Sequence, residues 1–397
     1  MDHMKKILSF IMSFIMMSVI VVMPAAALEP TEENKQNIVS QYFEEIAEYA
    51  PQDDVETVAL SFMRNSLKNE NIEISNVTPF YDLNDNVTAY CVTFQLGNSP
   101  CGYVLISLLN IEMPIVEFAF EGTGPVNTVR SIQAARGYSS APSTIRYFGP
   151  GTYFIDSTSA DTISDVFTNE TYSKSEVETA YTNYISSKAN VLSDVVIGDG
   201  ILDWADANID SSSIVKIPSF GSGTDYWLMT DFNDGNVCSP TCATNILWYW
   251  GNQKGYTWCI ENGDKTGYEL AQGLFTAMSL QMATVPPLGT LDIFIRDAYT
   301  NFLSFRGSNF NTRVLSQNVY SDFTAAIDDN CPIHTMLRNE SLFSTGHDVM
   351  TFGYGESNTG TEYLFVMDGW NNYGRFVYFD YFPIIKGVKV WVGSTAN

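Results

Sequence analysis

Histidine and basic residues are scarce in this sequence, and both shortages narrow what the chain can do. It has three histidines, and 20 lysines and arginines stand against 45 aspartates and glutamates, for a net charge of −25. A surface this acidic repels phosphate backbones, so we expect no nucleic-acid partner. No His-Glu-x-x-His pattern occurs. His334 and His347, with scattered acids, do not form a zinc pattern, so we expect no metal and no cofactor.

Long apolar runs are equally rare, and the one that stands out lies at the N-terminus. Lys5 and Lys6 precede an apolar run over 7–23, and three alanines follow at 25–27. A charged start, an apolar middle and small residues at the end are typical of a secretory signal peptide. We expect residues 1–27 to be removed, which leaves a secreted, monomeric protein without stable membrane association. An uncleaved membrane anchor is the alternative.

Cysteines are too few for a disulfide scaffold. The six are Cys91, Cys101, Cys238, Cys242, Cys259 and Cys331. An even number in an exported protein permits disulfides. Cys91 and Cys101 lie in two strand-like runs joined by "QLGNSP", so they could bridge a hairpin, although sequence does not fix the register.

The first half of the chain reads as a small α+β domain over 28–194. A helix is predicted from Val55 to Leu67, and alternating runs with Gly, Asn and Asp turns predict an antiparallel sheet. Asp82, Asn84 and Asn86 in "FYDLNDNVTAY" are incomplete as a calcium loop, and a hairpin turn explains them. Residues 195–225 are rich in Gly, Ser and Asp, which predicts a linker.

The second half, 226–397, is also predicted to be α+β. Helices are expected at 267–282 and 290–304, and strands at 332–337, 346–354, 362–367, 374–380 and 387–393. Helices first and antiparallel strands afterwards predict a domain with segregated layers.

The segment "DGNVCSPTCATNILWYWGN" places a cysteine before a buried helix. Pro240 suits a first helical turn and Ser239 can cap it. Cys238 then meets the positive end of the helix dipole, which favours a thiolate and lowers the thiol pKa. An ordinary buried cysteine is the alternative.

The scarcity of histidine selects a partner base for this thiol. His3 is lost with the signal peptide, and His334 in "CPIHTMLRN" is expected to be a core residue. His347 in "STGHDVMTFGYG" is therefore the candidate general base. Asp368 follows an apolar strand and could accept the imidazole N–H, which would fix the tautomer.

Together these motifs resemble the papain-like cysteine peptidases, near the bacterial secreted double-glycine peptidases and streptopain. The resemblance covers about 226–397 and is carried by "CSPTCATNILWYW", "GHDVMTFGYG" and "MDGWNNYGRF". It implies a central helix packed on an antiparallel sheet, with Trp370 shielding the His–Asp pair. It also implies that residues 28–194 are a propeptide that covers the active site.

The sequence departs from that family at three positions. Ser239 replaces a glycine, Cys242 replaces an alanine, and Phe232 stands where the family has a glutamine that binds the oxyanion. Asn233 or Asn236 is the candidate replacement donor, helped by a backbone N–H. Cys242 lies one turn deeper than Cys238 and ranks second as a nucleophile.

We therefore expect a cysteine endopeptidase that acts on peptides or proteins through Cys238, His347 and Asp368. It would form a thioester acyl-enzyme and be made as a zymogen. Two alternatives remain: transglutaminase or amidase chemistry on cell-wall peptides, and a non-catalytic exported binding protein with a degenerate peptidase domain.

Overall fold

The structure, a computed structural model, describes most of the chain between residues 40 and 392. The described ranges exclude 41, 45, 111, 136–143, 150, 158, 160, 167–169, 193–199, 219–225, 233–235, 261–266, 286–288, 307–309 and 339–345. The signal peptide predicted over 1–27 lies outside them. Among the described residues, no helix combines the length and apolar character needed to cross a membrane.

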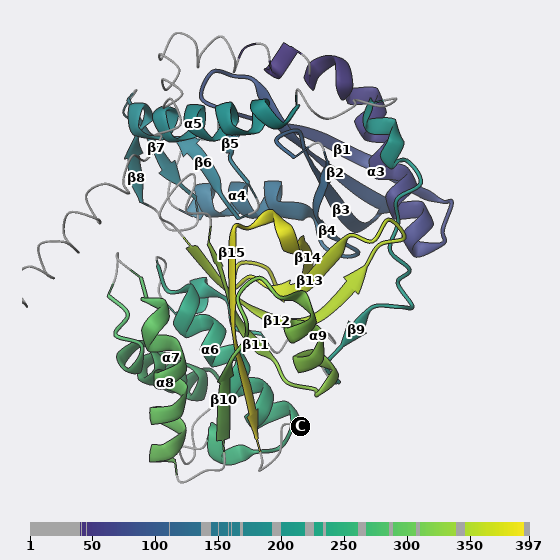
Figure 1. Cartoon of the computed structure of the whole chain (residues 1–397). Coiled ribbons are helices and arrows are strands. Elements are labelled where there is room, and N and C mark those ends of the chain that lie inside the picture. The colour runs from purple at the N-terminus through teal and green to yellow at the C-terminus, as the bar shows by residue number, and fades with distance from the viewer. Residues whose placement is uncertain are drawn as a thin grey trace, which may run out of the picture.

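Two α+β halves share one continuous sheet. The N-terminal half (residues 40–192) is purple to teal in Figure 1, and the C-terminal half (residues 226–392) is green to yellow. The strand order is β10-β15-β11-β12-β13-β14-β4-β3-β2-β1-β5-β6-β7-β8. The halves meet where β14 pairs with β4 through Phe376–Phe118 and Val377–Glu117.

The N-terminal half packs helices against antiparallel strands. Helix α3 (Gln52–Leu67) buries Val55, Val58, Ala59, Phe62 and Met63 along one face. The remaining elements are β1 (Ile72–Tyr81), β2 (Val87–Leu96), β3 (Ser99–Ser107), β4 (Ile115–Ala119), α4 (Gly124–Ala135), β5 (Ile145–Tyr147), β6 (Tyr153–Asp156), β7 (Thr162–Asp165), β8 (Thr171–Ser173) and α5 (Lys174–Leu192).

The C-terminal half places three helices on one side of its strands, and α9 on the other in Figure 1. The helical elements are η2 (Met229–Asp231), α6 (Cys238–Trp248), η3 (Tyr249–Gln253), η4 (Thr257–Cys259), α7 (Gly267–Gln281), α8 (Asp292–Phe305), α9 (Tyr320–Asp328) and η5 (Phe379–Tyr381). The strands are β10 (Phe310–Val314), β11 (Ile333–Arg338), β12 (Gly346–Glu356), β13 (Glu362–Met367), β14 (Arg375–Tyr378) and β15 (Ile384–Val392).

The α+β class and most predicted elements are confirmed. Helices α3, α7 and α8 and strands β11 to β15 lie where the periodicity placed them. Helices α4 and α9 and strands β5 to β8 and β10 were not predicted. The strands among them have three to five residues each, which is too short for an alternating pattern to show.

The stretch predicted as a linker, 195–225, is packed where the structure describes it. It carries η1 (Gly200–Trp204) and β9 (Val215–Lys216), and β9 pairs with β12. Ile209 is buried, and its N–H donates to the Ser66 hydroxyl at 3.0 Å. This stretch therefore contacts both halves, although its composition is that of a loop.

The Cys91–Cys101 bridge that the sequence left open does not form, because the hairpin register does not bring the two residues together. Cys91 lies opposite Leu105, and the pairing has a register shift between Thr93 and Gln95. Cys91 is buried and both thiols are free. The residue opposite Cys91 lies four positions beyond Cys101, which is farther than this one-residue shift moves the pairing, so the two thiols would not face each other without it.

The Asp82 loop is a hairpin turn, as the sequence favoured. The buried Asp82 carboxylate accepts the N–H groups of Asn84 and Asn86 at 2.8 and 2.9 Å. The Asn86 side-chain amide also donates to it at 2.9 Å. These bonds hold the turn between β1 and β2.

Aromatic side chains fill the junction between the halves. Phe118 of β4 stacks on Phe376 of β14, with ring centroids 4.7 Å apart, and meets Tyr363 edge-on. Phe376 in turn stacks on Phe365 at 4.2 Å. The Tyr363 hydroxyl donates to the Ile115 carbonyl at 2.9 Å. This buried aromatic core couples the stability of the two halves in the full chain.

Replacing Phe118 with alanine should therefore destabilise both halves together. A buried Phe→Ala change costs about 3–5 kcal/mol. Urea unfolding followed by fluorescence and circular dichroism should show one transition at lower urea. Phe305→Ala, at a side chain that is 91% exposed, is the matched control and should leave the midpoint unchanged. Two separate transitions in Phe118→Ala would contradict a shared core.

Candidate active site

Cys238 is the first residue of helix α6, whose remaining residues are all buried. The backbone N–H groups of Ser239 and Asp348 point at its sulfur. The helix begins earlier than predicted, with Val237 as its N-cap and no side-chain cap. The Ser239 hydroxyl lies inside the protein, 3.3 Å from His334 Nε2, so it does not cap the helix. A rigid buried helix thus presents the thiol at its tip.

His347 lies near the start of β12, next to the residue whose N–H reaches the Cys238 sulfur. Its Nε2 lies 2.8 Å from the main-chain carbonyl oxygen of Asp368. A carbonyl oxygen can only accept, so Nε2 carries the proton and Nδ1 is left as the basic nitrogen. Asp368 orients the imidazole as expected, but through its backbone.

The Asp368 carboxylate is used elsewhere, which corrects the role predicted for it. It accepts the N–H groups of Trp370 and Asn371, each at 3.0 Å, and the Asn371 side-chain amide. It also pairs with Arg375 of β14. Arg375 binds Glu117 of β4 in turn, with Nη1 to Oε1 at 2.8 Å. Asp368 is therefore part of a buried ion network that spans both halves.

The expected thiolate does not form in this arrangement. Burial raises the Cys238 pKa to about 12, and the Asp348 carboxylate adds to the rise. The two N–H groups on the sulfur and the charge of Arg338 oppose it without prevailing. Burial also lowers the His347 pKa to about 4. Both groups are neutral near pH 7, because desolvation outweighs the helix dipole here.

One oxyanion candidate is already occupied. The Asn236 side-chain amide donates to Glu170 Oε1 at 2.7 Å, and Glu170 belongs to the N-terminal half. Asn233 lies outside the described residues. Phe232, where the resembled family has glutamine, stacks on Phe275 with ring centroids 4.4 Å apart. A carboxylate oxygen of the N-terminal half thus takes one of the two amide hydrogens that could bind an oxyanion.

The N-terminal half closes over the histidine as well. Trp370 is buried in a cluster with Val126 and Val129 of α4. A cavity of about 30 Å³ touches His347, Asp368, Trp370 and Arg375, and its lining includes Glu117 and Gly151 of the N-terminal half. Such a space holds about one water molecule and excludes a peptide. The site is therefore covered from both the thiol side and the imidazole side.

His334, expected to be a core residue, and Cys242, the second-ranked nucleophile, are both interior. His334 is fully buried and lies 3.0 Å from the Tyr299 hydroxyl through Nδ1, as a core histidine should. Cys242 is also buried, and burial raises its pKa well above the usual value. Cys238 is the better placed nucleophile of the two cysteines, because part of its surface stays exposed.

The sequence did not single out Glu117, Arg375 or Asp348. Glu117 is the one charged residue among apolar residues in "PIVEFAF". A charge inside such an apolar run was the available signal, and the structure buries the whole strand. Arg375 follows a glycine in "NNYGRF" and looks like a turn residue. Asp348 directly follows His347 and was overshadowed by it.

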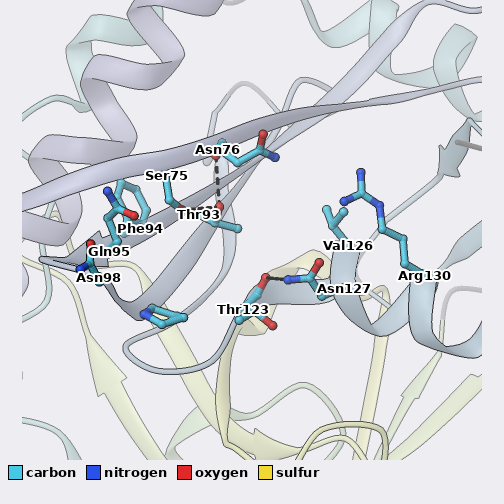
Figure 2. Close-up of a pocket in the computed structure, with 11 residues that line it drawn as sticks. Ser75, Asn76, Thr93, Phe94, Gln95, Asn98, Thr123, Val126, Asn127 and Arg130 are labelled. Atoms are coloured by element: carbon cyan, nitrogen blue, oxygen red, sulfur yellow. Dashed lines mark hydrogen bonds between the residues drawn. The ribbon is translucent and has the colours of Figure 1, made fainter.

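A larger hollow lies on the N-terminal half, between the β1–β2–β3 strands and α4. Figure 2 shows side chains that line it, among them Asn76, Gln95, Asn127 and Arg130. Its volume is about 260 Å³. None of the candidate catalytic residues lines it, so it is separate from the thiol site.

The chain was compared with known proteins. No family model matches it, and no curated protein matches it.

The lowered pKa of His347 gives the fold a defined response to acid. His347 takes up a proton near pH 6.5 in the unfolded chain and only near pH 4 in the folded chain. Its contribution to the free energy of unfolding is therefore full above pH 6.5 and is lost as the pH falls from 6.5 to 4. The loss is at most about 3 kcal/mol. Urea unfolding from pH 7 to 4 should show this slope, and His347→Gln should flatten it. An unchanged slope in the variant would refute the assignment.

Proposed function

We propose that the chain is a cysteine peptidase with a papain-like C-terminal domain, exported and made in a latent form. In that form residues 28–194 act as the propeptide. The observation that carries the proposal is the arrangement of three groups. The Cys238 sulfur lies against the N–H of residue 348, His347 is the residue before it, and the His347 Nε2–H is held by the Asp368 carbonyl.

The chemistry follows from the tautomer. With Nε2–H held by the carbonyl, Nδ1 is the basic nitrogen, and the proposed mechanism requires it to take the proton of the Cys238 thiol. The thiolate attacks a peptide carbonyl, and the backbone N–H groups and the Asn236 amide stabilise the oxyanion. His347 returns its proton to the leaving amine, a thioester remains on Cys238, and water hydrolyses it to a free acid. No step requires a metal or a cofactor.

Latency has a physical cause in the same geometry. Residues of the N-terminal half pack beside Cys238 and His347, and the resulting burial keeps the thiol and the imidazole neutral. Its Glu170 occupies the Asn236 amide, and its Glu117 binds Arg375 beside the imidazole. Removing this half would hydrate both reacting groups, lower the thiol pKa and raise that of the imidazole. Activation is therefore a change in solvation as much as the opening of a path.

A non-catalytic binding protein is the second candidate. The neutral thiol, the occupied Asn236 amide and the phenylalanine at position 232 favour it. The two candidates differ in one property, which is whether Cys238 becomes an acyl acceptor once the N-terminal half is displaced.

Hydrolysis of a quenched fluorescent peptide library should decide between them. We expect activity to appear with a fragment that begins within 195–225, and Cys238→Ala to abolish activity by at least about a thousandfold, as for other covalent nucleophiles. Cys242→Ala is the matched control on the same helix and should retain activity. Equal, measurable hydrolysis by the fragment with and without Cys238→Ala would exclude Cys238 as the nucleophile. No hydrolysis by the fragment would favour the binding protein.

A further inference from the structure

Asp348 is a buried acid placed directly behind the candidate nucleophile. It follows His347 on β12 and is 3% exposed. Successive side chains of a strand point to opposite faces, so Asp348 leaves the strand on the face away from the imidazole. A carboxylate buried this deeply needs partners, because an unpaired charge there is very costly.

Three side chains hold the Asp348 carboxylate. Arg338 Nη2 lies 2.8 Å from Oδ1, and His334 Nε2 lies 3.4 Å from Oδ2. The Ser239 hydroxyl hydrogen-bonds to the carboxylate as well. Burial alone would raise the Asp348 pKa, but Arg338, His334 and Ser239 together bring it below its usual value. The group is therefore a carboxylate near neutral pH.

Ser239 and Asp348 also contact the Cys238 sulfur through their backbones. Both hydrogen bonds to the sulfur come from the backbone N–H groups of Ser239 and Asp348. The side chains of Ser239 and Asp348 are bonded to each other. The hydroxyl–carboxylate contact thus ties the first turn of α6 to β12 at the point where both donors meet the thiol.

We propose that Asp348 is a positioning residue for the nucleophile. Its carboxylate, bonded to the Ser239 hydroxyl, holds α6 and β12 together so that both N–H groups stay on the Cys238 sulfur. This role in a reaction rests on the proposed peptidase function. The contacts of Asp348 with Ser239 and Arg338 do not depend on that function. Serine at position 239, where glycine was expected from the resembled family, is what makes this link available.

The charges near Cys238 determine whether each variant makes the thiolate easier or harder to form. A carboxylate beside the sulfur disfavours the thiolate, and Arg338 favours it. Arg338 is shared with Asp292 of α8 at 2.5 Å, and Asp292 binds Lys386 of β15 at 3.2 Å. The groups that face this cluster are Cys242 of α6, His334 and Arg338 of β11, Asp292 and Tyr299 of α8, and Lys386 of β15.

Two variants of the full chain should change the reactivity of the Cys238 thiol in opposite directions. Asp348→Asn removes the negative charge but keeps an acceptor for Ser239, so the thiolate becomes easier to form. Ser239→Ala keeps the charge but cuts the link, so the two N–H groups loosen and the thiolate becomes harder to form. Iodoacetamide labelling of the Cys238 peptide, followed by mass spectrometry from pH 7 to 9.5, measures both. We expect labelling roughly threefold to tenfold faster in the first and slower in the second.

The controls separate positioning from simple loosening of the fold. Asp292→Asn changes the far side of Arg338 and should shift labelling less than Asp348→Asn does. Loosened packing would speed labelling in both test variants, and that result would overturn the proposal, as would unchanged rates in both. Should Asp348→Asn fail to fold, Arg338→Gln removes a favourable charge and should slow labelling, and faster labelling would refute the proposal. Because labelling needs no peptide cleavage, the expected pattern in a chain without peptidase activity supports the positioning role and counts against the peptidase function alone.

Discussion

The buried contact between Glu117, Arg375 and Asp368 is the constraint on which the rest of the structure depends. Glu117 comes from β4 of the N-terminal half, and Arg375 and Asp368 come from β14 and the end of β13, yet all three are almost fully buried. The Tyr103 hydroxyl also donates to Glu117. Removing one partner would leave an uncompensated buried charge, which costs about 3–5 kcal/mol. The network therefore requires β4 to lie beside β14, and that pairing makes a single sheet of the two halves.

The chemistry of the candidate site follows from the same contact. Because Arg375 and the backbone of Trp370 and Asn371 take the Asp368 carboxylate, the imidazole is left with the Asp368 carbonyl. Glu117 of β4 lines the same small cavity as His347, and burial keeps both His347 and Cys238 neutral. A separate pair of contacts behind the sulfur, from Asp348 to Ser239 and Arg338, holds the thiol in place while it is neutral. In the described form the Cys238 thiol and the His347 imidazole are thus held in place, and both are neutral.

Local pattern was enough to predict the elements and the principal site residues, but not their connections. Proline and an apolar run marked α6, and the scarcity of histidine singled out His347. The role of Asp368 was mistaken because its partner Arg375 is bound to Glu117, which lies 258 residues away from Arg375 in sequence, and no local signal reports such a pairing. The thiol pKa was misjudged for the same reason, since the helix dipole is local and the burial comes from another part of the chain. The Cys91–Cys101 pairing stayed open in the sequence because the hairpin register is not a local property, and that register places Leu105 opposite Cys91.

The central claim is that the N-terminal half closes the thiol site through this buried network. Labelling of Cys238 by a peptide-based alkylating probe in the full chain carrying Glu117→Gln tests it most directly. The variant keeps the shape of Glu117 but leaves Arg375 with one carboxylate, so the halves should separate more often. We expect Cys238 to be labelled at least about ten times faster than in the unchanged chain, which corresponds to about 1.4 kcal/mol of weakened closure. A variant that melts at lower temperature but labels Cys238 no faster would contradict the account.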